Sequence, residues 1–265
     1  MTLVRASAGS RSLNPSTRAT ERRPRPGRLP LLKVALVLVV LVAVAGGAYG
    51  VYYLFLRPSG PPAVSLASLP PVTSTQPAPS GGLSGTWKVD TSIGSFADSS
   101  GSFVGYRVQE QLATLGANTA VGRTPDVSGT LTLAGTSVTA VEITADLTSL
   151  KSDDDRRDGQ LRRQGIQTGI YPNAKFSLTS PIDLGSSPAD GQTIQVQATG
   201  DLTLHGQTRR VQVPLSARLS GGVIAVTGSL PIVFADYGIQ KPSSFIVLSI
   251  ADQGTMELQL MFTKA

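Results

Sequence analysis

The feature that most constrains this chain is a run of 23 residues without a charge, at positions 34–56 (VALVLVVLVAVAGGAYGVYYLFL). As an α-helix the run would be about 35 Å long, which is enough to cross a hydrocarbon core of about 30 Å with some tilt. Tyr49, Tyr52 and Tyr53 lie toward its C-terminal end, where aromatic rings favour the membrane interface. The run therefore predicts a single transmembrane helix at 34–56.

The charges on the two sides of this run predict its orientation. Residues 1–33 carry eight basic residues and one acidic residue, whereas Arg57 is the only charged residue between the run and residue 83. Basic flanks stay in the cytoplasm, so we expect a cytoplasmic N-terminus and an extracytoplasmic C-terminal part in the cell envelope. The alternative is a cleaved signal peptide, because Ala43 and Ala45 form an A-x-A pattern. The apolar run continues for eleven residues beyond Ala45, and this favours an uncleaved signal anchor.

Composition divides the rest of the chain into three further parts. Residues 1–33 have too few apolar side chains to form a core, which predicts a disordered basic cytoplasmic tail. Residues 57–82 contain seven prolines among Ser, Thr, Gly and Ala, which predicts a flexible linker with some polyproline-II character. Residues 83–265 are long enough to bury a core of their own without disulfides, and the chain has no cysteine.

The net charge of the chain does not describe its folded part. The whole chain carries +6, but residues 83–265 hold 14 basic and 16 acidic residues and therefore carry −2. Proteins that bind nucleic acid through a folded domain need a basic face on it, so we expect no nucleic-acid partner. The basic tail is better explained by membrane topology and by attraction to anionic lipid.

Residues 83–265 carry the pattern of β-strands. Apolar and polar residues alternate with a period of two, which places one face of a strand in a core and the other in water. Helical patterns do not separate these segments, so a parallel α/β fold is disfavoured and an antiparallel sheet, sandwich or barrel is expected. The segments with this pattern are 87–89, 103–108, 127–133, 141–147, 192–205, 211–219, 223–234 and 256–262.

One short helix is predicted between the strands. Ser152 followed by the acidic run 153–155 is typical of a capped helix start, and Gly165 suits a helix C-terminus. Asp153 and Arg157 are spaced as an i,i+4 ion pair on such a helix.

Few residues carry chemistry. The one histidine, His205, precedes Gly206 on the polar side of its segment, so we expect it exposed at a hairpin turn, and it cannot form a triad or a histidine metal site alone. The acids at 153–155 lack the spacing of a calcium loop. We therefore expect no catalytic residue, no metal and no cofactor. A pair of carboxylates serving a hydrolase stays open, because the 16 acids of this part can meet in space.

Several motifs nevertheless form a pattern in their order and spacing. This pattern resembles the YceI-like family of lipid- or polyisoprenoid-binding proteins over essentially all of residues 84–265. The motifs are WKVD at 87–90, RDGQLR at 157–162, YPNAKF at 171–176, GDLTLHGQT at 200–208 and DYGI at 236–239.

The resemblance implies a mainly β fold: a lipocalin-like antiparallel barrel of about eight strands with one or two short helices. Its apolar tunnel would hold a polyisoprenoid or similar long-chain amphiphilic lipid, and the chain would be a membrane-anchored extracytoplasmic binding protein, not an enzyme. The matched motifs imply four ligand-binding residues, and the strand pattern adds Phe103 and Tyr106. The four are Leu161, Tyr171, Phe176 and Ile239.

Two other functions fit the same residues. A barrel filled by its own side chains would serve as a ligand-free envelope interaction or stress-response module. The carboxylate-based hydrolase is the second alternative. The sequence leaves the oligomeric state open.

Overall fold

The computed structural model describes residues 31–51, 60–69, 82–113, 116–242 and 247–265. The chain divides into two compact units, Met1–Tyr53 and Leu54–Ala265. The first contains helix α1, and the second contains every strand that the structure describes.

Helix α1 spans Leu31–Val51. Among the described residues it is the one helix long and apolar enough to cross a membrane, over Val34–Val51, and a signal sequence would have the same properties. Its apolar side chains are exposed all round, with Leu36 at 65% and Val42 at 71%. A helix that is apolar on every side requires an apolar environment. The predicted residues 52–56 lie outside the described part of the chain.

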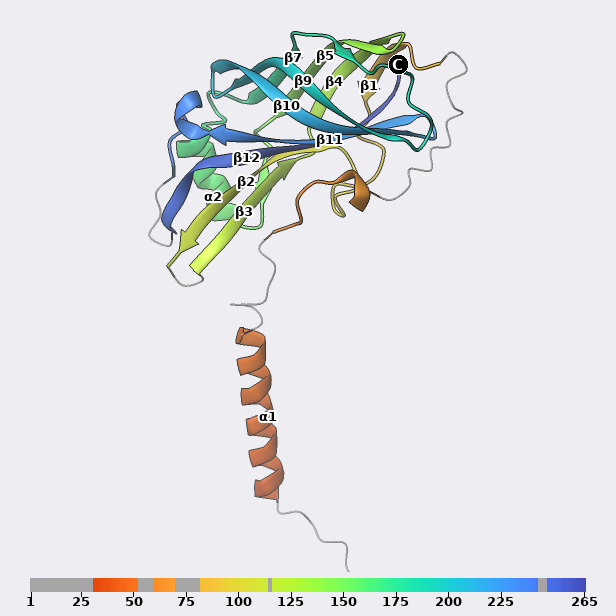
Figure 1. The fold of residues 1–265 in the computed structure, drawn as a ribbon. Helices are drawn as coiled ribbons and strands as arrows, with labels where there is room; N and C mark the ends of the chain where they lie inside the picture. Colours follow the sequence, from red (N-terminus) through yellow and green to blue (C-terminus); the bar gives the residue numbers. More distant parts are fainter. Residues whose placement is uncertain (1–30, 52–59, 70–81, 114–115, 243–246) are drawn as a thin grey trace, which may run out of the picture. The chain divides into compact units, whose positions relative to one another are not determined.

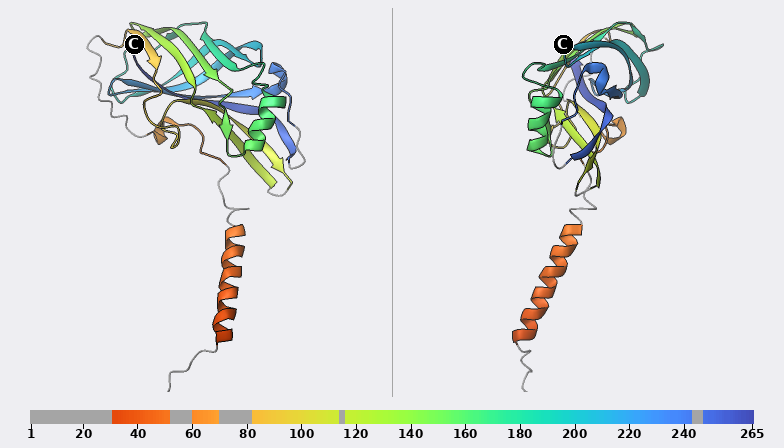
Figure 2. Two further views of the ribbon diagram at one scale, coloured as in Figure 1. Left: turned by 180° about the vertical axis from the view of Figure 1, so that it is seen from behind. Right: turned by 90° about the vertical axis from the view of Figure 1, so that its left-hand side faces the viewer.

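The second unit is mainly β (Figures 1 and 2). Its helical segments are short: the 3-10 turns η2 and η4, the α-helix α2 and the π-helical turn η3, over Leu66–Ser68, Phe234–Tyr237, Asp155–Gln160 and Leu161–Gly165. Its strands β1 to β12 span Gly85–Val89, Phe103–Leu112, Gly116–Thr124, Val127–Ala134, Ser137–Asp146, Lys151–Ser152, Asn173–Leu178, Ile182–Asp183, Thr193–Leu204, Gln207–Ser220, Val223–Val233 and Val247–Lys264.

Eight of these strands form a closed barrel. Their order around the ring is β1-β4-β5-β7-β9-β10-β11-β12, and β12 pairs back onto β1 with Trp87 opposite Lys264. Every pairing in the ring is antiparallel. The antiparallel barrel of about eight strands expected from the sequence is confirmed.

Strands β2 and β3 form an arm that lengthens the barrel at one end. Strand β12 is 18 residues long, and the edge that it does not share with β11 pairs with β1 at residues 262–264 and with β2 at residues 247–259. Strand β3 pairs with β2, and the two-residue β6 pairs with β3. Figure 1 shows this arm running away from β1, β4 and β5, with α2 beside it.

The outer face of β11 and β12 is covered by another segment of the chain. This differs from the alternation of the sequence, which predicts one wet face for each strand. Residues 60–69, which we call the strap, pack Leu66 and Leu69 against residues of β11 and β12. As a result Met261 is 0% exposed, although its neighbours on β12, Leu260 and Phe262, are the ones that face the barrel interior. The described part of the predicted 57–82 linker is therefore packed on the barrel. Two leucines three residues apart on a 3-10 turn give this segment an apolar side despite its prolines.

Candidate functional site

The closed ring encloses an apolar cavity of about 140 Å³, which we call the barrel cavity. Alternate residues of each strand face it, as the period of two requires. The atoms exposed in it are apolar, although Lys175, Gln192 and Arg218 also border it. Its apolar lining residues come from most strands of the ring and include Leu131, Ile143, Val196, Val213, Ile224 and Leu260.

A second cavity of about 320 Å³, which we call the arm cavity, lies where the arm meets the helical segments. Strands β2 and β12 supply one wall, η3 and the segment after η4 supply others, and most of the lining is apolar. Its apolar residues include Val108, Leu150, Leu161, Ile232, Ile239 and Ile250.

The two cavities are neighbours. Val104 of β2, Ala174 of β7 and Met256 of β12 line both of them, so these three side chains form the partition between the cavities. Several interior side chains are only partly buried, among them Ile143 and Ile224. A barrel filled by its own side chains would bury such residues fully, as protein interiors are close-packed. The interior is therefore hollow, and its mostly apolar lining is that of a site for an apolar ligand.

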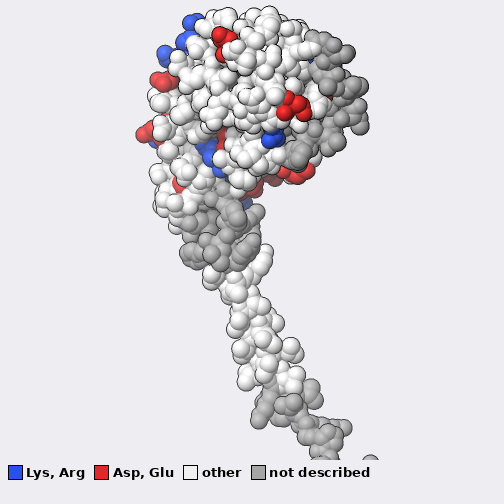
Figure 3. Space-filling view, turned by 45° about the vertical axis from the view of Figure 1, so that its right-hand side comes forward, with Lys and Arg blue, Asp and Glu red and all other residues white. Residues whose placement is uncertain are grey.

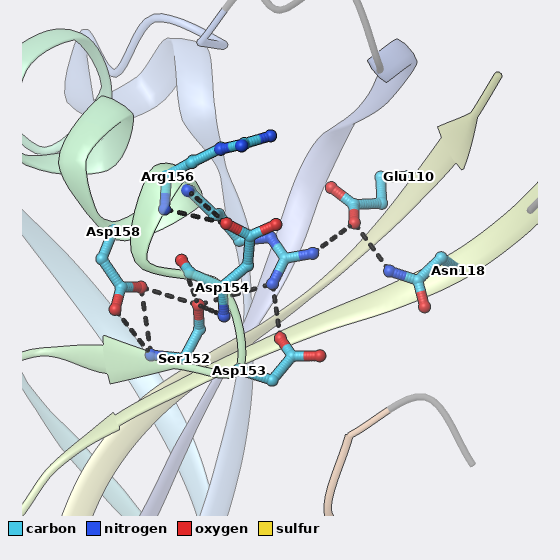
Figure 4. A network of polar contacts seen from close by, with 8 residues as sticks. Glu110, Asn118, Ser152, Asp153, Asp154, Arg156 and Asp158 are labelled. Carbon is cyan, nitrogen blue, oxygen red and sulfur yellow. Dashed lines mark hydrogen bonds and ion pairs between the residues drawn. The ribbon is translucent and has the colours of Figure 1, made fainter. Parts of the chain in front are cut away.

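One edge of the arm cavity carries a network of charged groups (Figure 4). Arg157 donates to Glu110 at 2.7 Å and to Asp153 at 2.6 Å, and Asn118 also donates to Glu110 at 2.7 Å. Burial lowers the pKa of Arg157, but the two carboxylates more than offset this, and the net direction is upward. The guanidinium therefore stays charged, and it fixes the start of α2 to the arm.

The start of α2 depends on two further acids (Figure 4). Asp154 is the N-cap, and its carboxylate accepts from the backbone N–H groups of Arg156 and Arg157. Asp158 is 4% exposed, and its carboxylate accepts hydrogen bonds from two groups of Ser152. The donors are the Ser152 hydroxyl, at 2.6 Å, and the Ser152 backbone N–H, at 3.0 Å. The predicted acid-capped helix is confirmed, but its N-cap residue is Asp154. Ser152 instead donates hydrogen bonds to Asp158.

Arg156 and Lys241 also line the arm cavity, as do Gln160 and Gln240. Lys241 also pairs with Asp252 at 2.5 Å. The face of the domain in Figure 3 is mostly uncharged, with basic and acidic side chains scattered over it. Among the described residues, no three His, Asp or Glu are grouped in a way that would hold a metal ion.

Four of the six predicted ligand-binding residues line the two cavities. Tyr106, Leu161 and Ile239 come from three separate segments and meet in the arm cavity. Phe176 lines the barrel cavity from β7. Their roles toward a ligand stay predictions.

The other two residues lie outside both cavities. Phe103 is 1% exposed on the opposite side of β2 from Tyr106, with the Arg123 guanidinium 4.2 Å from its ring centroid. Tyr171 packs against His205, with ring centroids 4.3 Å apart. His205 does lie at the β9–β10 turn, but it is partly buried rather than exposed. Its ring nitrogens lie 2.9 Å from Tyr237 O and 3.1 Å from Gln167 Oε1.

Sequence reasoning missed the partition and the polar edge. Glu110 and Arg157 are 47 positions apart, and no local pattern relates them. Val104 and Met256 both follow the apolar alternation of their segments. Only the register of β2 against β12, with Met256 opposite Tyr106, shows that the two side chains lie close together between the cavities.

Residues 95–262 match the family described as YceI-like domain. A UPF0312 protein from Vibrio parahaemolyticus is 36% identical over 74 residues, which are 28% of this chain and 35% of that protein. A UPF0312 protein from Vibrio cholerae is 27% identical over 137 residues, which are 47% of this chain and 67% of that protein. The chain thus spans about a third of the first relative and two thirds of the second.

Among solved structures, the fold is similar to a polyisoprenoid binding domain from Saccharophagus degradans implicated in plant cell wall breakdown. The TM-score is 0.52 at 22% identity, over 68% of this chain and 98% of that domain. The closed eight-stranded barrel, the hollow interior and the match over residues 95–262 agree, and the chain belongs to the YceI-like family.

Proposed function

We propose that this chain is a membrane-anchored, extracytoplasmic binding protein that holds or carries a polyisoprenoid or a similar amphiphilic lipid. The observation that carries the proposal is the pair of neighbouring apolar cavities, which share Val104, Ala174 and Met256. The family and the described polyisoprenoid binding of the similar Saccharophagus degradans domain support it. In this proposal residues 1–33 are a cytoplasmic tail, 34–56 cross the membrane, 57–82 connect, and 83–265 form the barrel.

A long apolar chain gains enough free energy in these cavities to bind without a charged contact. Each buried methylene contributes about 0.8 kcal/mol, so several five-carbon units exceed the association cost of about 4–15 kcal/mol. The atoms exposed in the barrel cavity are apolar, whereas the arm cavity also exposes polar atoms, so the tail occupies the barrel cavity and the polar end of the lipid stays in the arm cavity. We place that polar end near Glu110 and Arg157.

Binding explains the charged groups of the cavity better than catalysis does. Glu110 is engaged by Arg157 and Asn118, and Asp154 is engaged as the cap of α2. A glycosidase-like reaction needs two carboxylates facing each other across a substrate, one of them free to give up a proton. We infer that the domain is a binding protein and not an enzyme.

The test is native mass spectrometry of the full chain in detergent, offered isoprenoid quinones and polyprenyl phosphates of graded chain length. We expect one lipid per barrel and tighter binding as the chain grows, until both cavities are filled. A full chain that stays lipid-free with every ligand offered would contradict the proposal and favour the ligand-free envelope module.

A variant of the partition makes this test specific. Ala174→Phe places a ring between the two cavities, so the longest lipids should bind at least about tenfold more weakly, while lipids short enough for the arm cavity alone keep their affinity. Ala140→Phe is the matched control, because Ala140 is exposed on β5. Equal losses for short and long lipids would show that the partition does not divide the binding site.

A further inference from the structure

The strap at residues 60–69 lies before the residues that match the family. Figure 1 shows this segment running along the outside of the barrel, and both polar and apolar contacts bind it there. It begins beside β3, where a Cβ on Gly60 would lie 2.8 Å from Val121 Cγ2. It ends on β11 and β12, where Leu66 and Leu69 are 5% and 7% exposed against Val223, Ala225 and Met261. It therefore has contacts both on the arm and on the closed ring.

The polar contacts use a buried cluster of three charges. Glu257 of β12 is 1% exposed and accepts from Arg107 of β2 at 2.9 Å and from Arg123 of β3 at 3.4 Å. The two guanidinium groups also donate to consecutive strap carbonyls, Arg107 to Pro61 at 2.7 Å and Arg123 to Pro62 at 2.9 Å. The strap thus supplies acceptors to two cations that share one carboxylate.

These contacts lie directly behind the arm cavity. On β2, Tyr106 and Val108 face that cavity, whereas Arg107 between them faces the strap. On β3, Ala120 lines the cavity and Val121 lies under Gly60. One layer of β-sheet therefore separates the strap from the space assigned to the lipid.

The arm depends on such support, because it lies outside the closed ring. Strand β2 is held by β12, and β3 is held by β2 and by the two residues of β6. The β2–β12 pairing is also interrupted by register shifts between Val247 and Ser249 and between Ile250 and Gly254. In the described part of the chain, the outer edge of β3 is paired only at Gly122 and Arg123, so few backbone contacts oppose an outward movement of this strand, which makes it a region of low local stability.

We propose that the strap is a clamp that holds the β2–β3 arm against the barrel, and that its release opens the arm cavity for entry and exit of the lipid. The first half of this proposal concerns the fold alone. The second half rests on the lipid-binding function proposed above.

The test compares two substitutions at neighbouring strap positions in the full chain in detergent. Leu66→Asp places a charge in the buried contact with β11 and β12, and Ala67→Asp places the same charge at an exposed position of the same turn. We expect backbone amides of residues 116–124 to exchange hydrogen at least about fivefold faster in Leu66→Asp than in the wild type. Ala67→Asp should match the wild type.

The lipid part is measured as the rate at which a bound isoprenoid quinone leaves the same variants for empty acceptor vesicles. We expect Leu66→Asp to release it at least about fivefold faster and Ala67→Asp to release it at the wild-type rate. Arg107→Met, which removes the donors to Pro61 and Glu257, is the second variant if Leu66→Asp does not fold, and it should act in the same direction.

The possible failures are distinguishable. Unchanged amide exchange in folded Leu66→Asp and Arg107→Met chains would overturn the clamp, whether or not any lipid binds. Faster amide exchange with an unchanged rate of lipid release would overturn the entry route alone. A wild-type chain that takes up no quinone would contradict the proposed function, while the amide measurement still decides the clamp.

Discussion

At the scale of single residues, Glu257 connects β12 to both strands of the arm. Its carboxylate is 1% exposed, and two guanidinium groups donate to it. Glu257→Gln would leave both cations without a buried counter-charge. We expect the free energy of unfolding to fall by about 3–5 kcal/mol, as is typical when one partner of a buried ion pair is removed. Denaturant unfolding monitored by circular dichroism measures this change.

The exposed pair Asp201 and Arg210 is the control for that substitution. Arg210 donates to Asp201 at 2.7 Å between β9 and β10, but both side chains face water, at 36% and 63% exposed. Asp201→Asn should therefore leave stability nearly unchanged. Equal effects of the two substitutions would show that burial does not set the contribution of Glu257.

Tyr106 gives a prediction about pH. Burial raises the pKa of its phenol, and its hydroxyl has no hydrogen-bond partner among the described residues. The unfolded chain loses this proton near pH 10 and the folded chain keeps it, so stability falls as pH rises above 10, by about 1.4 kcal/mol per pH unit for this group. Tyr106→Phe should keep its stability at neutral pH and lose less of it between pH 10 and 11. Urea unfolding at both pH values, compared with the wild type, checks this.

Residues of the family motifs mostly support the fold. Trp87 is 0% exposed and donates to Leu83 O at 2.9 Å, and Asp158 organises the start of α2. Tyr171 and His205 come from two motifs and pack against each other, and a Cβ on Gly206 would lie 2.7 Å from the Tyr171 ring. Of the four ligand-binding residues that the motifs implied, three line the cavities: Leu161, Phe176 and Ile239. Tyr171 instead lies at a contact between loops.

At the scale of strands, two aromatic rings cover glycines on neighbouring strands. Tyr106 lies opposite Gly122 on β3, and Phe176 of β7 lies over Gly200 of β9. A Cβ at either glycine would overlap the ring. We expect Gly122→Ala and Gly200→Ala each to cost about 1–3 kcal/mol of stability, the usual cost of overpacking.

Gly169 is the matched position for this comparison. A Cβ there meets nothing within 4 Å, so Gly169→Ala should leave the thermal unfolding midpoint close to that of the wild type. Differential scanning calorimetry of the three variants measures these midpoints, and we expect those of Gly122→Ala and Gly200→Ala to lie below that of Gly169→Ala. A Gly122→Ala chain as stable as Gly169→Ala would show that the Tyr106 ring can move aside without cost.

Strands β5 and β10 have one wet face, and the sequence predicted both of them. Segments 141–147 and 211–219 alternate clearly and fall in β5 and β10. Strand β3 gave no such signal, because residues 120–124 are buried in succession, with the strap and the arm cavity on opposite sides. Strand β7 was predicted only through a family motif, although apolar and polar residues alternate over all six of its residues.

At the scale of the whole molecule, the proposed anchor has a direct test. If α1 is an uncleaved anchor, the full-length chain should remain in the membrane pellet after alkaline carbonate extraction. Protease added from outside should digest the barrel side of the chain and spare the tail at 1–33. A soluble product that begins at residue 46 would show cleavage after Ala45 and contradict the anchor.

The alternation predicted antiparallel strands and the family resemblance implied the barrel, whereas neither predicted the partition of its interior. Alternation fixes which residues of each strand face inward, and this is a local property. Whether the inward side chains fill the space depends on strand register and on the arm, which bring Val104, Ala174 and Met256 together from three distant strands. The strap escaped prediction for a similar reason, because its proline content indicates a spacer and its binding surface lies in β2, β3, β11 and β12.

The strap also has a mechanical consequence. A force that pulls on the chain from the N-terminal side of residue 60 reaches the strap before it reaches any strand of the barrel. Its attachments at Pro61, Pro62, Leu66 and Leu69 then bear the load one after another, so the strap peels off in steps. Peeling all ten residues adds up to about 35 Å of slack. The strap would thus detach under tension before any strand of the closed barrel unfolds.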